Sequence, residues 1–195
     1  PESPYAETKQ ICEKLIEKFS EEKRKHGISL RYFNPVGAHN SSLIGEIPRG
    51  IPDNLVPYIT QSAIGKRKKL KVFGMDYKTS DGTPVRDYIH VVDLANAHVQ
   101  ALNRLIEKKS KKFYEFFNVG TGRGYSVLEV IKSFEKVNNI KLPYEIVGRR
   151  EGDIEKIYSD TNLSRNELDW KAERNLDDMM KSAWKWQKTF KDLGS

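Results

Sequence analysis

The sequence predicts an α/β protein in which at least part of the sheet is parallel. Segments with the apolar spacing of a helix alternate along the whole chain with short apolar segments typical of strands. Neither an internal repeat nor a low-complexity stretch interrupts this alternation. The chain has 195 residues, of which 37% are hydrophobic and 31% are charged, so it can bury a sizeable core under a polar surface.

The first part of the chain is expected to form a helix, a strand and a long loop. Apolar side chains recur at helical spacing between Ile11 and Phe19, which predicts a helix over residues 5–25. Residues 28–33 are expected to form a strand. Residues 34–53 are rich in glycine, proline, asparagine and serine, and a loop of this length inside a compact domain often carries function.

The rest of the chain continues the alternation of helices and strands. The expected elements are, in chain order, a helix from Asp53 or Asn54 to residue 65, a strand over 70–73, a hairpin-type turn at Asp81-Gly82, a helix over 94–108 capped by Asp93, a strand over 113–119, a helix over 127–138 capped by Ser126, a strand over 142–147, and helices over 163–168 and 176–190. Helices between successive strands are the connections that parallel strands need.

Composition disfavours membrane, disulfide and metal proteins. No run of about 18 apolar residues occurs, and no basic cap followed by an apolar run marks a signal peptide. Cys12 is the single cysteine, so no intrachain disulfide is expected and a reducing cytoplasm is the simplest compartment. The four histidines lack metal-ligand spacing, so no metal is expected, and His90 is expected to be a satisfied core or turn histidine.

The formal net charge of +7 raises the question of nucleic acid. Two basic runs, residues 66–69 and 108–112, each follow an expected helix and precede an expected strand. Such placement favours solvated turns over a polyanion-binding surface, because lysine is stabilised near a helix C-terminus. Attraction for a small acidic molecule such as a nucleotide fits the charge equally well, and no nucleic-acid partner is expected.

Tyr5 and Lys9 form the first candidate catalytic pair. They are four residues apart at the start of the first helix and therefore lie one turn above each other on the same face. An ammonium so placed favours the phenolate, which can serve as a general base. The alternative is a solvated helix start, since a chain rich in lysine brings one such pair together by chance.

Two loops could bind an anion. Residues 118–126 contain glycines spaced G-x-G-x-G rather than G-x-G-x-x-G, so a tight turn between a strand and a helix is favoured over a dinucleotide loop. Arg149, Arg150 and Asp153 bring two guanidinium groups and a carboxylate into one loop, a combination suited to phosphate and sugar hydroxyls. The alternative for that loop is a surface ion-pair cluster.

Taken together, these motifs resemble one protein family. Tyr5-Ala-Glu-Thr-Lys9 resembles the Tyr-x-x-x-Lys motif of the extended short-chain dehydrogenase/reductases. Within that superfamily the UDP-hexose 4-epimerase family is indicated by Leu30-Arg-Tyr-Phe-Asn-Pro-Val-Gly-Ala-His39, Gly50-Ile-Pro-Asp-Asn-Leu-Val-Pro-Tyr58, Phe73-Gly-Met-Asp-Tyr77, Asp81-Gly-Thr-Pro-Val-Arg-Asp-Tyr-Ile-His-Val91, Asn118-Val-Gly-Thr-Gly122 and Arg149-Arg-Glu-Gly-Asp153. The resemblance covers essentially the whole chain.

The resemblance implies the later part of a doubly wound Rossmann-type domain plus a small α/β substrate-binding domain. Residues 1–35 and 75–120 are expected to contribute to the nucleotide-binding domain, and 36–74 and 121–195 mainly to the UDP-sugar-binding domain. The family's N-terminal half, with its glycine-rich cofactor loop, has no counterpart in the sequence. An isolated chain of this kind is therefore expected to have negligible NAD affinity and no activity.

The resemblance also implies an activity. Members of the family interconvert UDP-glucose and UDP-galactose, a step of galactose metabolism, by NAD-dependent oxidation and re-reduction at sugar C4. Tyr5 would be the base, and Lys9 would hold the nicotinamide ribose and favour the phenolate. Because binding strength lies in the nucleotide, the sugar can turn between the two hydride transfers. A cytoplasmic homodimer, with the first helix in the interface, is the implied assembly.

By the same resemblance, the site residues fall into two groups. Those expected near the cofactor are Tyr5, Lys9, Tyr32, Phe33 and Pro35. Those expected around the UDP-sugar are Asn34, Asn54, Leu55, Lys71, Phe73, Arg86, Arg150, Asp153 and Ile157. In the second group Arg86 and Arg150 would face the diphosphate, Phe73 would meet the uridine with its backbone, and Asp153 would bind the ribose. Ile157 occupies a position that governs acceptance of N-acetylated sugars.

Two alternatives stay open. The chain could belong to another nucleotide-sugar epimerase or a dehydratase of the same superfamily, and substrate profiling would decide. It could also be a non-catalytic fragment that associates with its N-terminal half or with a second copy. The apolar face of the first helix, with Ile11, Leu15 and Phe19, is the feature that favours association.

Overall fold

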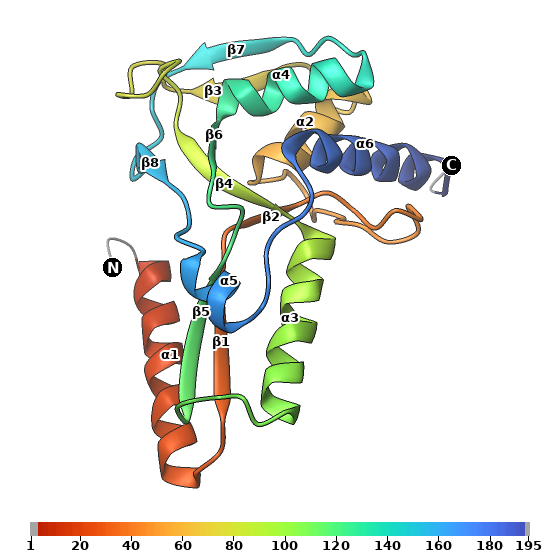
Figure 1. Ribbon diagram of the computed structural model, residues 1–195. Coiled ribbons are helices and arrows are strands. Elements are labelled where there is room, and N and C mark those ends of the chain that lie inside the picture. The colour runs from red at the N-terminus through yellow and green to blue at the C-terminus, as the bar shows by residue number, and fades with distance from the viewer. Residues whose placement is uncertain (1–3, 194–195) are drawn as a thin grey trace.

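The structure is a computed structural model that describes residues 4–193 (Figure 1). Its helices are α1 Pro4–Lys23, α2 Leu55–Ala63, α3 Val91–Ile106, α4 Val127–Asn138, α5 Asn162–Glu167 and α6 Leu176–Leu193. Its strands are β1 Gly27–Tyr32, β2 Asn34–Val36, β3 Leu70–Phe73, β4 Val85–His90, β5 Tyr114–Val119, β6 Gly124–Ser126, β7 Tyr144–Val147 and β8 Lys156–Ile157. Every expected helix and strand is present, with ends that differ by a few residues.

Parallel pairing dominates the strands. β1 pairs with β5, β2 with β4, β3 with β7 and β8 with β4, all in parallel. The single antiparallel ladder in the described part of the chain joins β4 to β6. The predicted α/β class with parallel strands is therefore confirmed. β4 is the central strand of the largest sheet, because β2, β6 and β8 all pair with it.

Two hydrophobic clusters divide the molecule. In the lower part of Figure 1, α1 and α3 flank the β1–β5 pair, and the cluster there contains Ile89, Phe117 and Trp170. In the upper part, α2, α4 and α6 lie beside β3, β4 and β7 around a larger cluster that includes Phe134, Met179 and Met180. β4 crosses between the parts, since its Tyr88 belongs to the upper cluster and its Ile89 to the lower.

The helix caps agree with the sequence in one case and not in another. Ser126 caps α4 through a capping box with Glu129, as predicted. The predicted cap of α3, Asp93, is wrong: the cap is His90, whose Nδ1 accepts the N–H of Val92 at 3.1 Å. Asp93 is instead buried and ion-paired with Arg174. Its carboxylate therefore binds the segment before α6 and does not cap the N-terminus of α3.

Four strands, β2, β4, β6 and β8, were not among the expected elements. β2 lies inside the segment 34–53, where only loop was predicted, and β6 and β8 are two or three residues long. The Asp81-Gly82 turn exists, with Gly82 at φ +78°, but it does not close a hairpin. β3 and β4, which flank it, pair with different partners. Strands this short carry too little periodicity to be recognised without their neighbours.

Other composition-based expectations concern the surface. The basic runs 66–69 and 108–112 lie in mainly exposed turns that follow α2 and α3. No helix within residues 4–193 is long and apolar enough to cross a bilayer. Over the same residues, no three histidine, cysteine or acidic side chains gather where they could hold a metal ion. Cys12 is a free, exposed thiol.

Candidate functional site

A cavity of about 550 Å³ opens beside β4 and contains two arginines; we call it the two-arginine cavity. It is lined by Asn34, Ile51, Pro52, Asp53, Asn54, Leu55, Tyr58, Leu70, Lys71, Phe73, Pro84, Arg86, Tyr88, Val127, Arg150 and Asp153. Eight of the nine residues expected around a UDP-sugar are in this set. The segments that contribute them are far apart in the sequence.

Local structure explains how these side chains meet. β4 alternates its side chains, so Arg86 and Tyr88 face the cavity while Asp87 between them faces the opposite side. Phe73 is the last residue of β3, and Asn54 occupies the N-cap position of α2 without a side-chain capping bond. Its amide is therefore not committed to the helix end.

The two guanidinium groups share one carboxylate. Arg86 Nη2 donates to Asp153 Oδ1 at 3.5 Å, and Arg150 Nε lies 3.7 Å from Asp153 Oδ2. The guanidinium of Arg150 also lies over the ring of Phe73, 5.0 Å from its centroid. Two cations on one anion leave a net positive charge in a half-enclosed cavity. Such an arrangement favours a phosphate-bearing ligand.

Tyr88 forms part of the cavity floor and was not predicted. It is 4% exposed, and its burial raises the pKa of its phenol to about 12, against a smaller opposing effect of Arg86. Tyr88 is therefore neutral at physiological pH and contributes a wall and a hydroxyl dipole. Its position two residues after Arg86 on one strand was the sequence signal that could have identified it.

Ile157 does not line the cavity. It is 42% exposed on β8 and lies opposite Arg86 in the parallel β4–β8 register. The expected position that governs acceptance of N-acetylated sugars is thus next to the two-arginine cavity but not in it. Its role stays a prediction.

Tyr5 and Lys9 lie on one face of the first turns of α1. The Lys9 Nζ is 5.2 Å from the centroid of the Tyr5 ring, as the spacing of four predicted. Tyr5 is 70% exposed and is not among the residues that line the two-arginine cavity. The N-terminus of α1 lies at the same end of the β1–β5 pair as the carboxyl ends of those strands (Figure 1). In parallel sheets ligands bind at this end.

The other residues expected near a cofactor follow β1. Tyr32 is half exposed and its ring lies 6.4 Å from that of His98, while the N–H of Phe33 donates to Val119 O at 3.1 Å. Pro35 is exposed in β2. Together with Tyr5 and Lys9 these residues form a surface at the carboxyl end of β1, and none of the five lines the two-arginine cavity.

The glycine-rich turn at residues 118–126 binds a carboxylate of the protein itself, that of Asp87 on β4. The N–H groups of Thr121 and Gly122 donate to the carboxylate of Asp87 at 3.0 and 3.1 Å. A Cβ on Gly120 would lie 2.5 Å from Asp87 Oδ2, so only glycine permits this approach. The turn therefore binds an internal carboxylate in place of a phosphate. The tight turn was predicted, but Asp87 was not.

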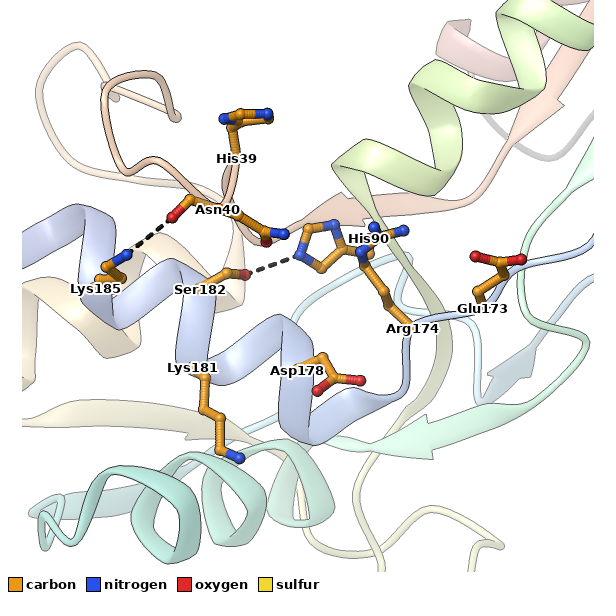
Figure 2. Close-up of a pocket in the computed structure, with 9 residues that line it drawn as sticks. All are labelled: His39, Asn40, His90, Glu173, Arg174, Asp178, Lys181, Ser182 and Lys185. Atoms are coloured by element: carbon orange, nitrogen blue, oxygen red, sulfur yellow. Dashed lines mark hydrogen bonds between the residues drawn. The ribbon is translucent and has the colours of Figure 1, made fainter.

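A second cavity of about 550 Å³ lies where α6 meets the start of α3 (Figure 2). Since Nδ1 of His90 accepts an N–H, Nε2 carries the proton and donates to Ser182 Oγ at 3.0 Å. Burial and the nearby Arg174 lower the pKa of His90. In Figure 2, His39 and Lys181 point away from each other rather than toward a common centre. The satisfied histidine expected from the sequence is confirmed, and the cavity is a polar junction.

The chain resembles known proteins over almost its whole length. The sequence model of the GDP-mannose 4,6 dehydratase family matches residues 1–183. A UDP-glucose 4-epimerase of Pasteurella multocida (strain Pm70) is 54% identical over 187 residues, which are 95% of this chain and 54% of that protein. The UDP-glucose 4-epimerase of Homo sapiens is 49% identical, again over 95% of this chain and 53% of its own length.

Solved structures give the same result. A UDP-glucose-4-epimerase from Stenotrophomonas maltophila, with bound NAD and formylated UDP-arabinopyranose, aligns with a TM-score of 0.93 at 47% identity over 98% of this chain and 56% of that chain. The enzyme from Bifidobacterium longum in complex with NAD+ and UDP aligns with a TM-score of 0.89 at 47% identity, over 96% of this chain and 55% of that one. The chain spans about half the length of the relatives it matches.

Proposed function

The chain belongs to the GDP-mannose 4,6 dehydratase family, and from that premise we propose that it supplies the UDP-sugar site and the catalytic base of a UDP-glucose 4-epimerase. The reaction would interconvert UDP-glucose and UDP-galactose in galactose metabolism. Relatives at about half identity that carry this name support the choice of epimerase within the family.

The observation that carries the proposal is the two-arginine cavity. Arg86 and Arg150 present two guanidinium groups that a diphosphate can bridge, and Phe73, whose ring lies under the Arg150 guanidinium, would meet the uridine with its backbone. Asn34 and Asn54 line the same cavity with amides that suit sugar hydroxyls. A ligand with a base, a diphosphate and a sugar fits this order of groups.

NAD is the proposed cofactor, and the surface at the carboxyl end of β1 fits its nicotinamide end. Exposed Tyr5, Lys9 and Tyr32 offer a hydroxyl, an ammonium and an aromatic ring there. When bound, NAD supplies a reversible hydride acceptor. The turn at Gly120–Gly122 is committed to Asp87, so the cofactor's pyrophosphate must be held by groups other than this turn.

In the proposed mechanism each residue of the chain has a separate task. Tyr5 Oη takes the proton of the sugar 4-hydroxyl and later returns it, and the Lys9 ammonium stabilises the phenolate. Arg86 and Arg150 hold the diphosphate. Because affinity is concentrated at the nucleotide, the keto sugar can turn its other face before it is reduced.

Assembly, compartment and domain division are parts of the same proposal. A homodimer through α1 is supported by the exposure of Ile11, Leu15 and Phe19, which are 49%, 63% and 57% exposed. A cytoplasmic location is supported by the single free thiol. Residues 1–35 and 75–120 are proposed for the nucleotide-binding domain and 36–74 and 121–195 for the sugar-binding domain, and the two hydrophobic clusters support a division.

The test is an assay of the full-length protein, expressed from its complete reading frame, with NAD and UDP-galactose. Formation of UDP-glucose with no net change in NAD is expected. Formation of a 4-keto-6-deoxy sugar would instead make the protein a dehydratase, the reaction in the name of the matched family model. Absence of turnover with either sugar, in a folded protein that binds UDP, would support the non-catalytic alternative.

A further inference from the structure

Asp87 is the most deeply buried carboxylate beside the two-arginine cavity, and the proposed mechanism does not use it. Its exposed fraction is 0%, and no lysine, arginine or histidine within residues 4–193 forms an ion pair with it. A buried carboxylate without a cation is costly unless hydrogen-bond donors surround it. The hydrogen-bond donors around Asp87 therefore show which segments of the chain its carboxylate connects.

The donors come from two segments that are distant in sequence. From the glycine-rich turn, Thr121 donates its N–H at 3.0 Å and its hydroxyl at 2.5 Å to Oδ1, and Gly122 donates its N–H at 3.1 Å to Oδ2. From the segment after β8, Ser159 donates its N–H at 3.2 Å and its hydroxyl at 2.5 Å to Oδ2. One carboxylate thus joins β4 to both segments.

The bonds to Ser159 bear on the two-arginine cavity. Ser159 lies two residues after Ile157, and β8 pairs in parallel with β4 so that Ile157 lies opposite Arg86. At the other end of this segment, the N–H of Val85 donates to Glu155 O at 2.9 Å. The segment 153–159 is therefore hydrogen-bonded to β4 near both of its ends, through Glu155 and through Ser159. We call this double attachment the fastening of the segment.

This fastening sets the distance between the groups proposed to bind the diphosphate and ribose. Arg86 and Asp87 are adjacent on β4, and Asp153 is 3.5 Å from Arg86 at the start of the fastened segment. If the segment moved along β4, Asp153 and the loop with Arg150 would move with it. Binding groups must be held within about 0.5 Å of their productive geometry, so a displacement of about 1 Å is expected to weaken ligand binding.

We propose that Asp87 is a positioning residue for the nucleotide-sugar site: its carboxylate fixes the segment 153–159 on β4 and thereby sets the geometry of Arg86, Asp153 and Arg150. The inference rests on the proposed function, because it assumes that these three residues bind UDP. Asp87 does not touch the ligand, and it acts through Ser159 and the strand pairing.

The first test compares two buried carboxylates in the full-length protein, with UDP as the probe. Asp87→Asn replaces an acceptor oxygen by an N–H₂ group that faces backbone donors. The matched control is Asp93→Asn: Asp93 is also buried and accepts the N–H groups of Glu173 and Arg174, at 3.1 and 2.9 Å, but lies outside the two-arginine cavity. Both variants are expected to melt at lower temperature. Calorimetry well below both melting temperatures should show UDP affinity reduced about tenfold or more for Asp87→Asn and within about twofold for Asp93→Asn.

The second test uses milder variants, so that it remains decisive if Asp87→Asn does not fold. Ser159→Ala and Thr121→Val each remove one hydroxyl that bonds Asp87 at 2.5 Å. Only Ser159 belongs to the segment that continues from Asp153. Ser159→Ala is therefore expected to weaken UDP binding about threefold to tenfold, and Thr121→Val to leave it within about twofold.

The outcomes separate the inference from the proposed function. If the wild-type protein does not bind UDP, the proposed function fails and the inference falls with it. If the wild type binds UDP and both Asp87→Asn and Ser159→Ala bind it equally well, the proposed function stands and the positioning role is overturned. Equal loss of affinity in Ser159→Ala and Thr121→Val would also overturn it, since the effect would then follow stability alone.

Discussion

The two-arginine cavity and the Tyr5–Lys9 surface differ in how completely the chain builds them. Eight expected ligand residues converge on the cavity from β2, α2, β3, β4 and the loop before β8. The five residues expected near a cofactor lie on a surface where Tyr5 is 70% exposed and Tyr32 is 54% exposed. The cavity is lined from several elements, whereas Tyr5 does not line it.

The difference matches the proposed division of the chain into residues that bind the ligand and residues that carry out the chemistry. Binding groups are held by ion pairs and strand register within the described residues, so the cavity is preorganised without further contacts. The pair at the start of α1 has the expected mutual geometry, with Lys9 Nζ 5.2 Å from the centroid of the Tyr5 ring, but Tyr5 is 70% exposed. α1 buries little of its surface, since Ser20 is its single buried residue. Substitutions in the two regions should therefore affect different observables.

The largest effect is expected from Tyr5→Phe in the full-length protein. Removal of the hydroxyl removes the proposed proton acceptor, and turnover of UDP-galactose is expected to fall by about 10² or more, since general acid–base steps contribute at least that much. UDP affinity should stay within about twofold, because Tyr5 lies outside the two-arginine cavity. Steady-state kinetics and calorimetry measure the two quantities. Retention of more than about a tenth of the activity would contradict the assignment of Tyr5 as base.

The next effect is expected from Arg150→Ala, with its neighbour as a matched control. Arg150 lines the cavity and lies over Phe73, whereas Arg149 points to Asp76, 2.7 Å from Nε, and lies outside the cavity. A lost charge-assisted bond to phosphate costs about 1.5–3 kcal/mol, so UDP affinity should fall about tenfold to a hundredfold. Arg149→Ala removes an exposed ion pair and should change UDP affinity by less than about twofold. Equal effects of the two variants on calorimetric affinity would mean that overall charge, and not the cavity, attracts the ligand.

The sequence predicted the residues that line the two-arginine cavity better than the buried residues that hold those lining residues in place. Arg86, Arg150 and Asp153 lie in recognisable motifs, so the resemblance to a family identified them from the sequence alone. Asp87 lies in the same motif, but its role depends on donors 34 and 72 residues away along the chain. A contact at such separation leaves no local pattern. The Asp93–Arg174 ion pair was missed for the same reason: the two residues are far apart in the sequence, and Asp93 alone has the local pattern of a helix cap.

For the fold, long periodic elements were predictable and short ones were not. α1, α3 and α4 carry several turns of helical spacing, and their bounds were predicted to within a few residues. β2, β6 and β8 exist because β4 pairs with them, so their stability comes from tertiary context rather than from their own sequence. Tertiary context also explains why the turn at Asp81-Gly82 does not close a hairpin, since β3 pairs with β7 and β4 pairs with β2 instead of with each other.

The smallest effect separates the stability of the lower part from the function of the cavity. Arg104 donates to both oxygens of Glu115, at 2.9 and 2.8 Å, and these bonds hold the pKa of Glu115 below its ordinary value of 4.5. A carboxyl whose pKa is lowered by folding stabilises the protein above its unfolded pKa, and this stabilisation is lost as pH falls through the folded pKa. Glu115→Gln should therefore lower the free energy of unfolding by about 1–2 kcal/mol at pH 7, since Arg104 keeps Glu167 as a partner.

That deficit should begin to shrink as pH falls below about 4.5, where Glu115 of the unfolded chain takes up a proton. It should disappear only below the lower pKa of the folded state, where folded Glu115 is protonated as well. Urea denaturation across this pH range measures it. UDP affinity at pH 7 should be unchanged, because Glu115 lies on β5 in the lower part of the molecule and outside the two-arginine cavity. A pH-independent deficit would show that the Gln side chain disturbs packing rather than the ion pair. Weakened UDP binding in Glu115→Gln would show that the lower part of the molecule and the two-arginine cavity are energetically coupled, and would contradict their independence.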